Sequence, residues 1–386
     1  MFIIFSTILF SVLGIHIIYP YVLKRLSKRI KTRANTNLVH PGDSHFSGSS
    51  SLPVVSILIP VYNEEIVIQR RLNNIFSSDY PKDKLEVIIV DSGSTDKTRL
   101  IIEKVFLEKV NLIKEGQRTG KARAINLGLA ICKGEIVLLT DGTTLYERDT
   151  IIKLVESFRD PSVGAVSALY NVPNKQQNHI VASEHFFWTQ KDKIRVLESA
   201  VFSTSWLSGE ACAFRNNIIN KIDEDSLADD SNIALQVISK GHRVVVTDET
   251  HFSEPSPSEL YDYLKIKTRR ALGGLIETIR FRRLIFQRQY GLFGLIIFPY
   301  RFFSQLISPV ASCTAAILAI PSFIEIFSYL GVYLTLFLGL TLLSIVIRYR
   351  DLFVVYLYTQ IITLGGIFLL LIGRVDVLWT KSRTKL

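Results

Sequence analysis

The fold of this chain is decided by the stretch Glu135-Ile136-Val137-Leu138-Leu139-Thr140-Asp141-Gly142-Thr143-Thr144, an apolar run of strand length that ends abruptly in an acid and a glycine. Carboxylates at the carboxyl end of a buried strand lie where open α/β sheets bind ligands. An acid there, beside a glycine that permits close approach, suits a divalent cation that holds phosphates. The alternative is a strand followed by an ordinary Asp-Gly turn. The neighbouring segments decide between the two.

Three further short apolar runs precede this stretch, and helical patterns separate them. The expected strands cover Val54–Pro60, Leu85–Val90, Val110–Ile113 and Glu135–Thr140. Strands that alternate with helices predict a parallel sheet with helices on both faces. Asp91 and Asp141 close two of the strands, and Lys121 provides a compact positive charge between them, as a diphosphate site requires.

The composition places a soluble domain between two apolar ends. Of 386 residues, 48% are hydrophobic, and they concentrate in 1–23 and 302–373. The net charge is 45 − 35 = +10, but six basic residues cluster in Lys24–Arg33, directly after an apolar span. That arrangement indicates the cytoplasmic flank of a membrane helix rather than a nucleic-acid-binding surface. Cys132, Cys212 and Cys313 are too far apart in sequence to suggest a disulfide framework or a zinc site.

The membrane layout follows from these apolar segments. We expect an uncleaved N-terminal helix and about three C-terminal spans, over Phe302–Ile320, Ser328–Ile347 and Leu352–Gly373. Three spans would place the basic tail outside, against the positive-inside tendency, unless one segment is re-entrant. The expected parts of the chain are a transmembrane helix (1–23), a basic flank and linker (24–53), an α/β domain (54–280), an interfacial amphipathic helix (281–303), transmembrane helices (304–373) and a basic tail (374–386).

Four motifs in order give the chain a resemblance to a known family. They are Pro60-Val61-Tyr62-Asn63-Glu64, Asp91-Ser92-Gly93-Ser94-Thr95-Asp96, Gly120-Lys121-Ala122-Arg123-Ala124-Ile125-Asn126 and Asp141-Gly142-Thr143. Together they resemble the signature of inverting family 2 glycosyltransferases. More narrowly, they are similar to the membrane-integrated synthases of cellulose, chitin, hyaluronan and poly-N-acetylglucosamine. The resemblance implies a GT-A fold, with a Rossmann-like mixed sheet, that binds a nucleotide sugar, usually linked to UDP.

The resemblance assigns the donor side residue by residue. Asp91 would accept a hydrogen bond from the base, Glu64 would lie near the nucleoside, and Lys121 would lie near the diphosphate. Asp141 matches the first acid of the Asp-x-Asp motif, which holds the nucleotide and a Mg²⁺ or Mn²⁺ ion. Thr143 stands where the family has the second acid, and a hydroxyl is a poorer ligand for a hard cation than a carboxylate.

The acceptor side follows in the segment Ser203–Arg215, which resembles the glycine-containing acceptor loop of the family. Trp206 could stack on a sugar or a lipid headgroup, although a buried core position would explain a tryptophan equally well. Glu210 is a second candidate for contact with the acceptor.

Asp229 and Asp230 open a predicted helix that ends at Gly241. Acids stabilise the N-terminus of any helix, which is the alternative explanation. The pair also resembles the Thr-Glu-Asp motif, which makes Asp230 the catalytic base. Two adjacent carboxylates can raise one pKa, as suits a base near neutral pH.

A basic helix is expected over Tyr261–Arg283, and Lys267–Gly274 within it resembles the Gln-x-x-Arg-Trp motif. Arg270 matches the arginine, whose guanidinium can clamp a departing diphosphate. Ala271 replaces the tryptophan that lies beneath the growing chain in relatives, which argues against long-chain processive synthesis. A solvated or membrane-facing basic surface is the alternative for Arg269 and Arg270.

The sequence therefore predicts a metal-dependent, membrane-bound inverting glycosyltransferase with a cytoplasmic catalytic domain at the plasma membrane. Its partners would be a nucleotide sugar, a glycan or lipid acceptor and membrane lipids. Two rivals are a non-catalytic sugar-nucleotide-binding subunit of a polysaccharide assembly and a transporter without enzymatic activity. The donor sugar, the linkage, the acceptor and the oligomeric state stay open.

Overall fold

A single mixed sheet forms the centre of the molecule. The computed structural model describes residues 2–37, 52–348 and 350–373, so the predicted basic tail and most of the linker lie outside the described residues. Within these ranges, eight strands pair in the order β3-β2-β1-β4-β7-β6-β8-β5. The strands are β1 (Val55–Val61), β2 (Leu85–Asp91), β3 (Asn111–Lys114), β4 (Ile136–Leu139), β5 (Leu145–Tyr146), β6 (Val163–Asn171), β7 (Cys212–Arg215) and β8 (Arg243–Ser253).

The register of the sheet gathers the predicted ligand-binding strand ends. β1 pairs in parallel with both β2 and β4, and Val61 lies opposite Asp91. β7 is antiparallel to β4 and to β6, so the sheet is mixed, as the GT-A expectation requires. Because the carboxyl ends of parallel strands meet at one edge of a sheet, the segments after β1, β2 and β4 lie together.

Helices cover both faces because the central strands are buried on both sides. In β1, Ile57 and Ile59 join one core cluster and Leu58 joins the other, as strand alternation requires. α2, α3 and α5 pack on the first face, and α4 and α7 pack on the second. The bounds are α2 (Ile68–Phe76), α3 (Thr98–Phe106), α4 (Lys121–Leu129), α5 (Thr150–Glu156) and α7 (Asp229–Ser239).

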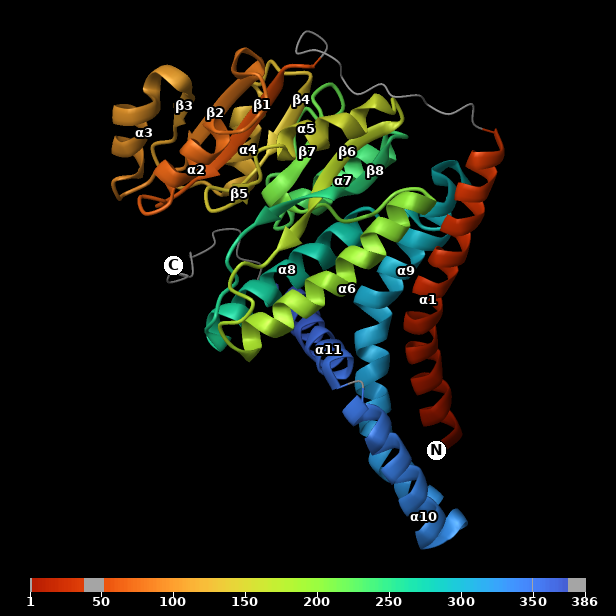
Figure 1. Cartoon of the computed structure of the whole chain (residues 1–386). Helices are drawn as coiled ribbons and strands as arrows, with labels where there is room; N and C mark the ends of the chain where they lie inside the picture. The colour runs from red at the N-terminus through yellow and green to blue at the C-terminus, as the bar shows by residue number, and fades with distance from the viewer. Residues whose placement is uncertain (1, 38–51, 349, 374–386) are drawn as a thin grey trace.

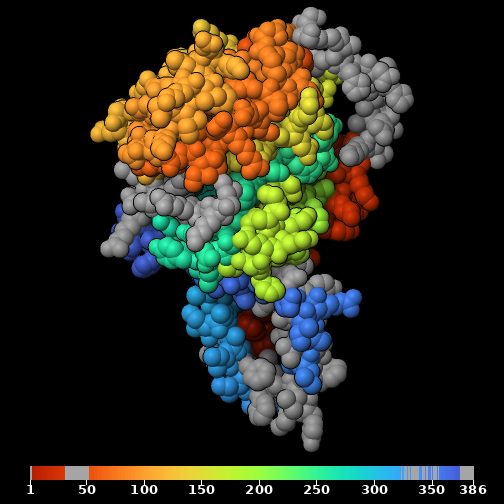
Figure 2. All heavy atoms as spheres, turned by 60° about the vertical axis from the view of Figure 1, so that its left-hand side comes forward, coloured from red at the N-terminus to blue at the C-terminus, as the bar shows by residue number. Residues whose placement is uncertain are grey.

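Two long helices, α6 (His179–Val201) and α8 (Leu260–Arg280), lie beneath the sheet and connect it to the apolar helices (Figure 1). α1 (Phe2–Asn37) runs beside the C-terminal helices, which project beyond the α/β domain (Figure 2). Tyr19 of α1 stacks on Tyr300 with 3.5 Å between ring centroids, and its hydroxyl donates to Glu198 Oε1 of α6 at 2.6 Å. These contacts fix the N-terminal helix against the domain.

The segment 281–303 does not form the single helix that the sequence predicted. The segment forms two short 3₁₀ turns, Arg282–Leu284 and Arg288–Tyr290, before a helical stretch begins at Phe293. That stretch runs through α9 (Phe298–Phe302) into α10 (Ser308–Arg348). Phe293 and Phe298 are fully buried in the core on the α1 side of the sheet, so they cannot face a membrane surface.

The membrane helices differ from the predicted boundaries. α1 continues through Pro20 to Asn37, so the helix includes the basic flank and extends past the predicted end at residue 23. α10 continues past Pro321 and breaks instead at Gly331, whose φ is 70°. Among the described residues, two helical stretches are long and apolar enough to cross a membrane, Phe2–Ile30 and Phe293–Ser322. A shorter apolar stretch, Tyr356–Leu371, lies in α11 (Arg350–Leu371). The predicted count of three C-terminal spans is therefore not confirmed.

The buried position of Phe298 can be tested through stability. Phe298→Ala should destabilise the protein by about 3–5 kcal/mol, because it removes a large core side chain and leaves a cavity. Leu295→Ala is the matched control, since Leu295 is 40% exposed in the same stretch. Thermal unfolding in detergent measures both. Equal shifts of the melting temperature would contradict the core assignment.

Candidate functional site

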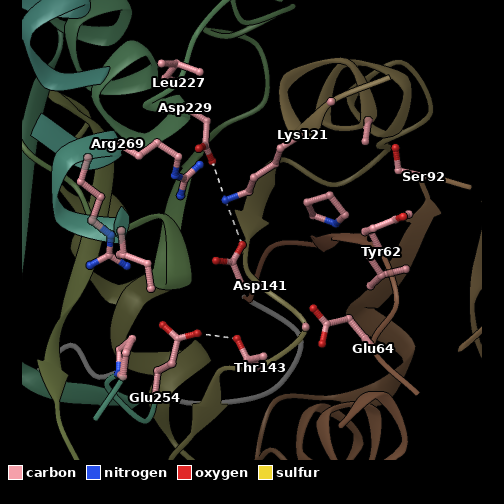
Figure 3. Close-up of a pocket in the computed structure, with 18 of the residues that line it drawn as sticks. Tyr62, Glu64, Ser92, Lys121, Asp141, Thr143, Leu227, Asp229, Glu254 and Arg269 are labelled. Carbon is pink, nitrogen blue, oxygen red and sulfur yellow. Dashed lines mark hydrogen bonds and ion pairs between the residues drawn. The ribbon is translucent and has the colours of Figure 1, made fainter. Parts of the chain in front are cut away.

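A cavity of about 270 Å³ opens at the carboxyl ends of β1 and β4 (Figure 3). Asp141 reaches it from the end of β4, Lys121 from the start of α4, and Glu254 from the end of β8. Arg269 and Arg270 of α8 line its opposite wall. We call this space the donor cavity, because predicted donor-side residues line it.

Lys121 lies at the centre of the site. Its ammonium is 2.9 Å from Asp141 Oδ1 and 3.0 Å from Asp229 Oδ2 (Figure 3). Burial lowers the pKa of Lys121, but the two carboxylates more than reverse that effect and raise the pKa above its ordinary value. The lysine therefore stays charged and joins the end of β4 to the start of α7.

Glu64 and Tyr62 form the wall on the β1 side. Glu64 lies close against Gly142, where an added Cβ would come within 3.3 Å of Glu64 Cγ. The guanidinium of Arg118 lies over the Tyr62 ring at 4.2 Å and also lines the cavity. The sequence reasoning assigned no role to this stacked pair, which offers a flat platform of the size of a base.

Asp91 lies behind the residues that line the donor cavity and does not line the cavity itself. Its side chain is fully buried, accepts from the Ser94 N–H at 3.1 Å, and pairs with Arg99 at 2.6 Å. Its neighbour Ser92 lines the donor cavity. The contact of Asp91 with a base therefore stays a prediction.

Glu254 faces Thr143 across the donor cavity and was missed by the sequence reasoning. The Thr143 hydroxyl donates to Glu254 Oε1 (Figure 3). Burial, followed by the charges of Glu210 and Asp141, raises the pKa of Glu254 to about 8. A lone acid in an extended segment carries no motif, so the sequence held no signal for it.

A second cavity of about 440 Å³ lies on the side of the apolar helices. Its lining includes Trp206 and Trp188 of the domain together with His16, Tyr300 and Gln360 of α1, α9 and α11. We call it the acceptor cavity, because the predicted acceptor-side residues Trp206 and Glu210 line it. It shares part of its wall with the donor cavity, namely Lys121, Asp141, Leu227, Asp229, Tyr263, Lys267, Arg269 and Arg270.

Asp230 lines the acceptor cavity next to that shared wall. Burial, followed by the charges of Asp229 and Glu210, raises the pKa of Asp230 to about 6. Glu210 is paired with Arg270 at 3.0 Å. The structure thus brings together the residues predicted as base, neighbouring acid, arginine clamp and acceptor contact.

Basic and aromatic side chains form the floor of the acceptor cavity. Trp206 is half-buried and lies 3.1 Å below the Lys191 ammonium, so it is not a closed core residue. Burial, followed by the charges of Arg195 and Lys267, lowers the pKa of Lys191 well below its ordinary value. Lys267, at the glutamine position of the motif, is paired with Glu184 at 2.6 Å. Lys191 and Glu184 come from α6, which carried no recognised motif.

The side chains of the donor cavity suit a hard divalent cation. Asp141, Thr143 and Glu254 provide only oxygen donors, which Mg²⁺ and Mn²⁺ prefer. Within the described residues, no three His, Cys, Asp or Glu side chains lie close enough to hold a metal ion by themselves. The donors therefore fit a cation that takes its remaining ligands from a bound diphosphate.

The family model for glycosyl transferase family 2 matches residues 56–223, from β1 through β7 and the wall that carries Lys121 and Asp141. These residues form a glycosyl transferase family 2 domain. The resemblance to family 2 glycosyltransferases that the four motifs predicted is confirmed, together with a GT-A-like fold.

One solved structure is similar over almost the whole chain. It is the mannosyltransferase PcManGT from Pyrobaculum calidifontis in complex with GDP-Man and Mn²⁺, with a TM-score of 0.76 and 26% identity. The match covers 97% of this chain and 99% of that chain. The similarity therefore extends through the apolar helices as well as the family 2 domain.

Two curated relatives match shorter parts. The probable glycosyltransferase YdaM of Bacillus subtilis is 28% identical over 65% of this chain and 63% of its own length. The beta-monoglucosyldiacylglycerol synthase of Nostoc is 33% identical over 36% of this chain and 29% of its own length. The chain thus spans less than two thirds of either relative.

Proposed function

We propose that this protein is a membrane-bound inverting glycosyltransferase that moves a sugar from a nucleotide sugar to a hydroxyl group in the acceptor cavity. One observation carries the proposal: the donor and acceptor cavities meet at Lys121, Asp141 and Asp229, with Asp230 on the acceptor side. A donor diphosphate beside Lys121 would hold its sugar at the junction, within reach of an acceptor near Asp230.

The donor would bind as a nucleoside diphosphate sugar. The similar mannosyltransferase holds GDP-Man and Mn²⁺, and the donor cavity here provides Lys121, Arg269 and Arg270 for the phosphates. A divalent cation, when bound at Asp141, would neutralise charge on the departing diphosphate. The Tyr62–Arg118 stack supports a base at the other end of the cavity.

The transfer would proceed in line. The acceptor oxygen forms a bond to the anomeric carbon as the bond from that carbon to the diphosphate breaks, which inverts the configuration. Asp230 takes the proton of the acceptor hydroxyl, because its raised pKa makes it a stronger base than an ordinary aspartate. Lys121 and Arg270 stabilise the charge that moves onto the leaving diphosphate.

The acceptor would be lipid-borne. Large apolar side chains of α1 and α10 point outward, with Ile17, Ile317 and Ile320 each at least 70% exposed, as a lipid environment favours. The acceptor cavity lies between these helices and the catalytic side chains. One relative is a glycolipid synthase, which supports the same class of acceptor.

Nucleotide release by the purified protein tests this function. In nanodiscs with membrane lipid extract, we expect metal-dependent release of UDP or GDP from one of UDP-glucose, UDP-N-acetylglucosamine, UDP-glucuronate and GDP-mannose. Asp230→Asn should lower turnover at least about 10²-fold, as loss of a general base does, and leave nucleotide binding within about twofold. Asp248→Asn, which changes an exposed acid of β8, is the control.

Two results would contradict the proposal. Full turnover in Asp230→Asn would remove Asp230 as the base. Nucleotide binding without release from any donor would favour the non-catalytic subunit instead.

The pH dependence of turnover follows from the raised pKa of Asp230. Below about pH 6 the carboxyl group is protonated and cannot accept a proton, so the rate should fall about tenfold per pH unit and level off above. Glu210→Gln removes a negative charge that raises this pKa, so the midpoint should move to lower pH. Rate profiles between pH 4.5 and about 8 measure both; an unmoved midpoint would assign the titration to another group.

Trp206 tests the assignment of the acceptor cavity. Trp206→Ala removes the stacking surface below Lys191, so the KM for the acceptor should rise by about tenfold, as the loss of 1–2 kcal/mol of aromatic contact predicts. The KM for the donor should not change, since Trp206 does not line the donor cavity. Steady-state kinetics with each substrate varied in turn separate the two, and an effect on the donor alone would contradict the assignment.

A further inference from the structure

Thr143 occupies the motif position at which an acid would hold the cation, and the structure places Glu254 directly opposite it. β5 pairs antiparallel with β8, with Leu145 opposite Ser253 and Tyr146 opposite Phe252. Because antiparallel register continues beyond the paired residues, this pairing brings the segment at 143–144 against the segment at 254–255. The Thr143–Glu254 hydrogen bond is the direct result.

The backbone of Glu254 is held from a second side. β8 also pairs in parallel with β6, with Asn171 opposite Ser253. The Tyr170 hydroxyl donates to the Glu254 carbonyl at 2.8 Å. Glu254 therefore leaves the sheet at a fixed point and directs its carboxylate into the donor cavity beside Asp141 (Figure 3).

Among the acids around this cavity, Glu254 differs in its charge balance. Asp141 is paired with Lys121, and Glu184 is paired with Lys267. Within the described residues, no Lys, Arg or His lies in ion-pair contact with Glu254. A half-buried carboxylate with no direct ion pair is costly, and a bound cation would lower that cost.

We propose that Glu254 is the second protein carboxylate ligand of the divalent cation and takes the place of the acid that Thr143 lacks. The inference rests on the proposed function, because the cation would be the one that holds the donor diphosphate. Mg²⁺ and Mn²⁺ sites of this kind use one or two carboxylates together with phosphate oxygens and waters. Asp141 and Glu254 would supply the two carboxylates from opposite strands.

Binding of Mn²⁺ to the full chain in nanodiscs, followed by electron paramagnetic resonance with UDP or GDP present, tests the proposal without turnover. Glu254→Gln should weaken Mn²⁺ binding at least about tenfold, since even the loss of an outer partner of a ligand costs that much. Glu254→Gln combined with Thr143→Asp should restore binding, because the acid returns at the family position.

Glu184→Gln is the matched control, since Glu184 lines the same cavity but is already paired with Lys267. It should leave Mn²⁺ affinity unchanged. Thermal unfolding of each variant separates loss of the ligand from loss of the fold.

Three outcomes would overturn the proposal. Unchanged Mn²⁺ affinity in Glu254→Gln shows that Glu254 is no ligand. If Glu254→Gln weakens Mn²⁺ binding and the added Thr143→Asp does not restore it, although both variants are folded, then Glu254 only holds the Thr143 segment in place. Absence of nucleotide-dependent Mn²⁺ binding in the unchanged protein removes the metal from the proposed function as well.

Discussion

The ion pairs of Lys121 determine the geometry of the whole site. The lysine begins α4, and its ammonium contacts Asp141 after β4 and Asp229 at the start of α7. Without it, the two carboxylates would face each other without the ion-pair partner that they share. Because Asp230 follows Asp229 directly, the same ion pairs place the proposed base relative to the donor cavity. The donor and acceptor sides are therefore joined by one side chain.

The elements that the sequence predicted well are those with local signals. β1, β2 and β4 are short apolar runs that end in polar residues, and α4 and α7 begin at clear helix starts. β6 was not predicted, because its pairing with β7 and β8 depends on segments far away in the chain. The segment 281–303 was assigned wrongly for the same reason. Its arginines and aromatics fit an interfacial helix, but the segment begins with two short 3₁₀ turns, and Phe293 and Phe298 pack in the core.

The residues of the candidate site also differ in whether a local sequence signal predicts them. Asp141, Lys121, Asp230 and Arg270 lie within family motifs, and the fold brings them to one junction. Glu254 carries no motif, and its position becomes meaningful only when β5 pairs with β8. Motifs read in chain order therefore miss a site residue that another strand supplies. Thr143 alone suggests a weakened metal site. With Glu254 beside it, the proposed site has the second carboxylate that Thr143 lacks.

Ala271 is a second position at which this chain lacks a side chain that the family motif has. The family tryptophan is absent there, yet Ala271 lines a cavity that already holds Trp206 and Trp188 from other elements. Aromatic surface for an acceptor is therefore present, and the small side chain widens the space beside it. The other walls come from α1, α9 and α11, which carry the apolar surface of the protein. This cavity lies between the proposed catalytic side chains and the apolar helices, an arrangement that supports the proposed lipid-borne acceptor.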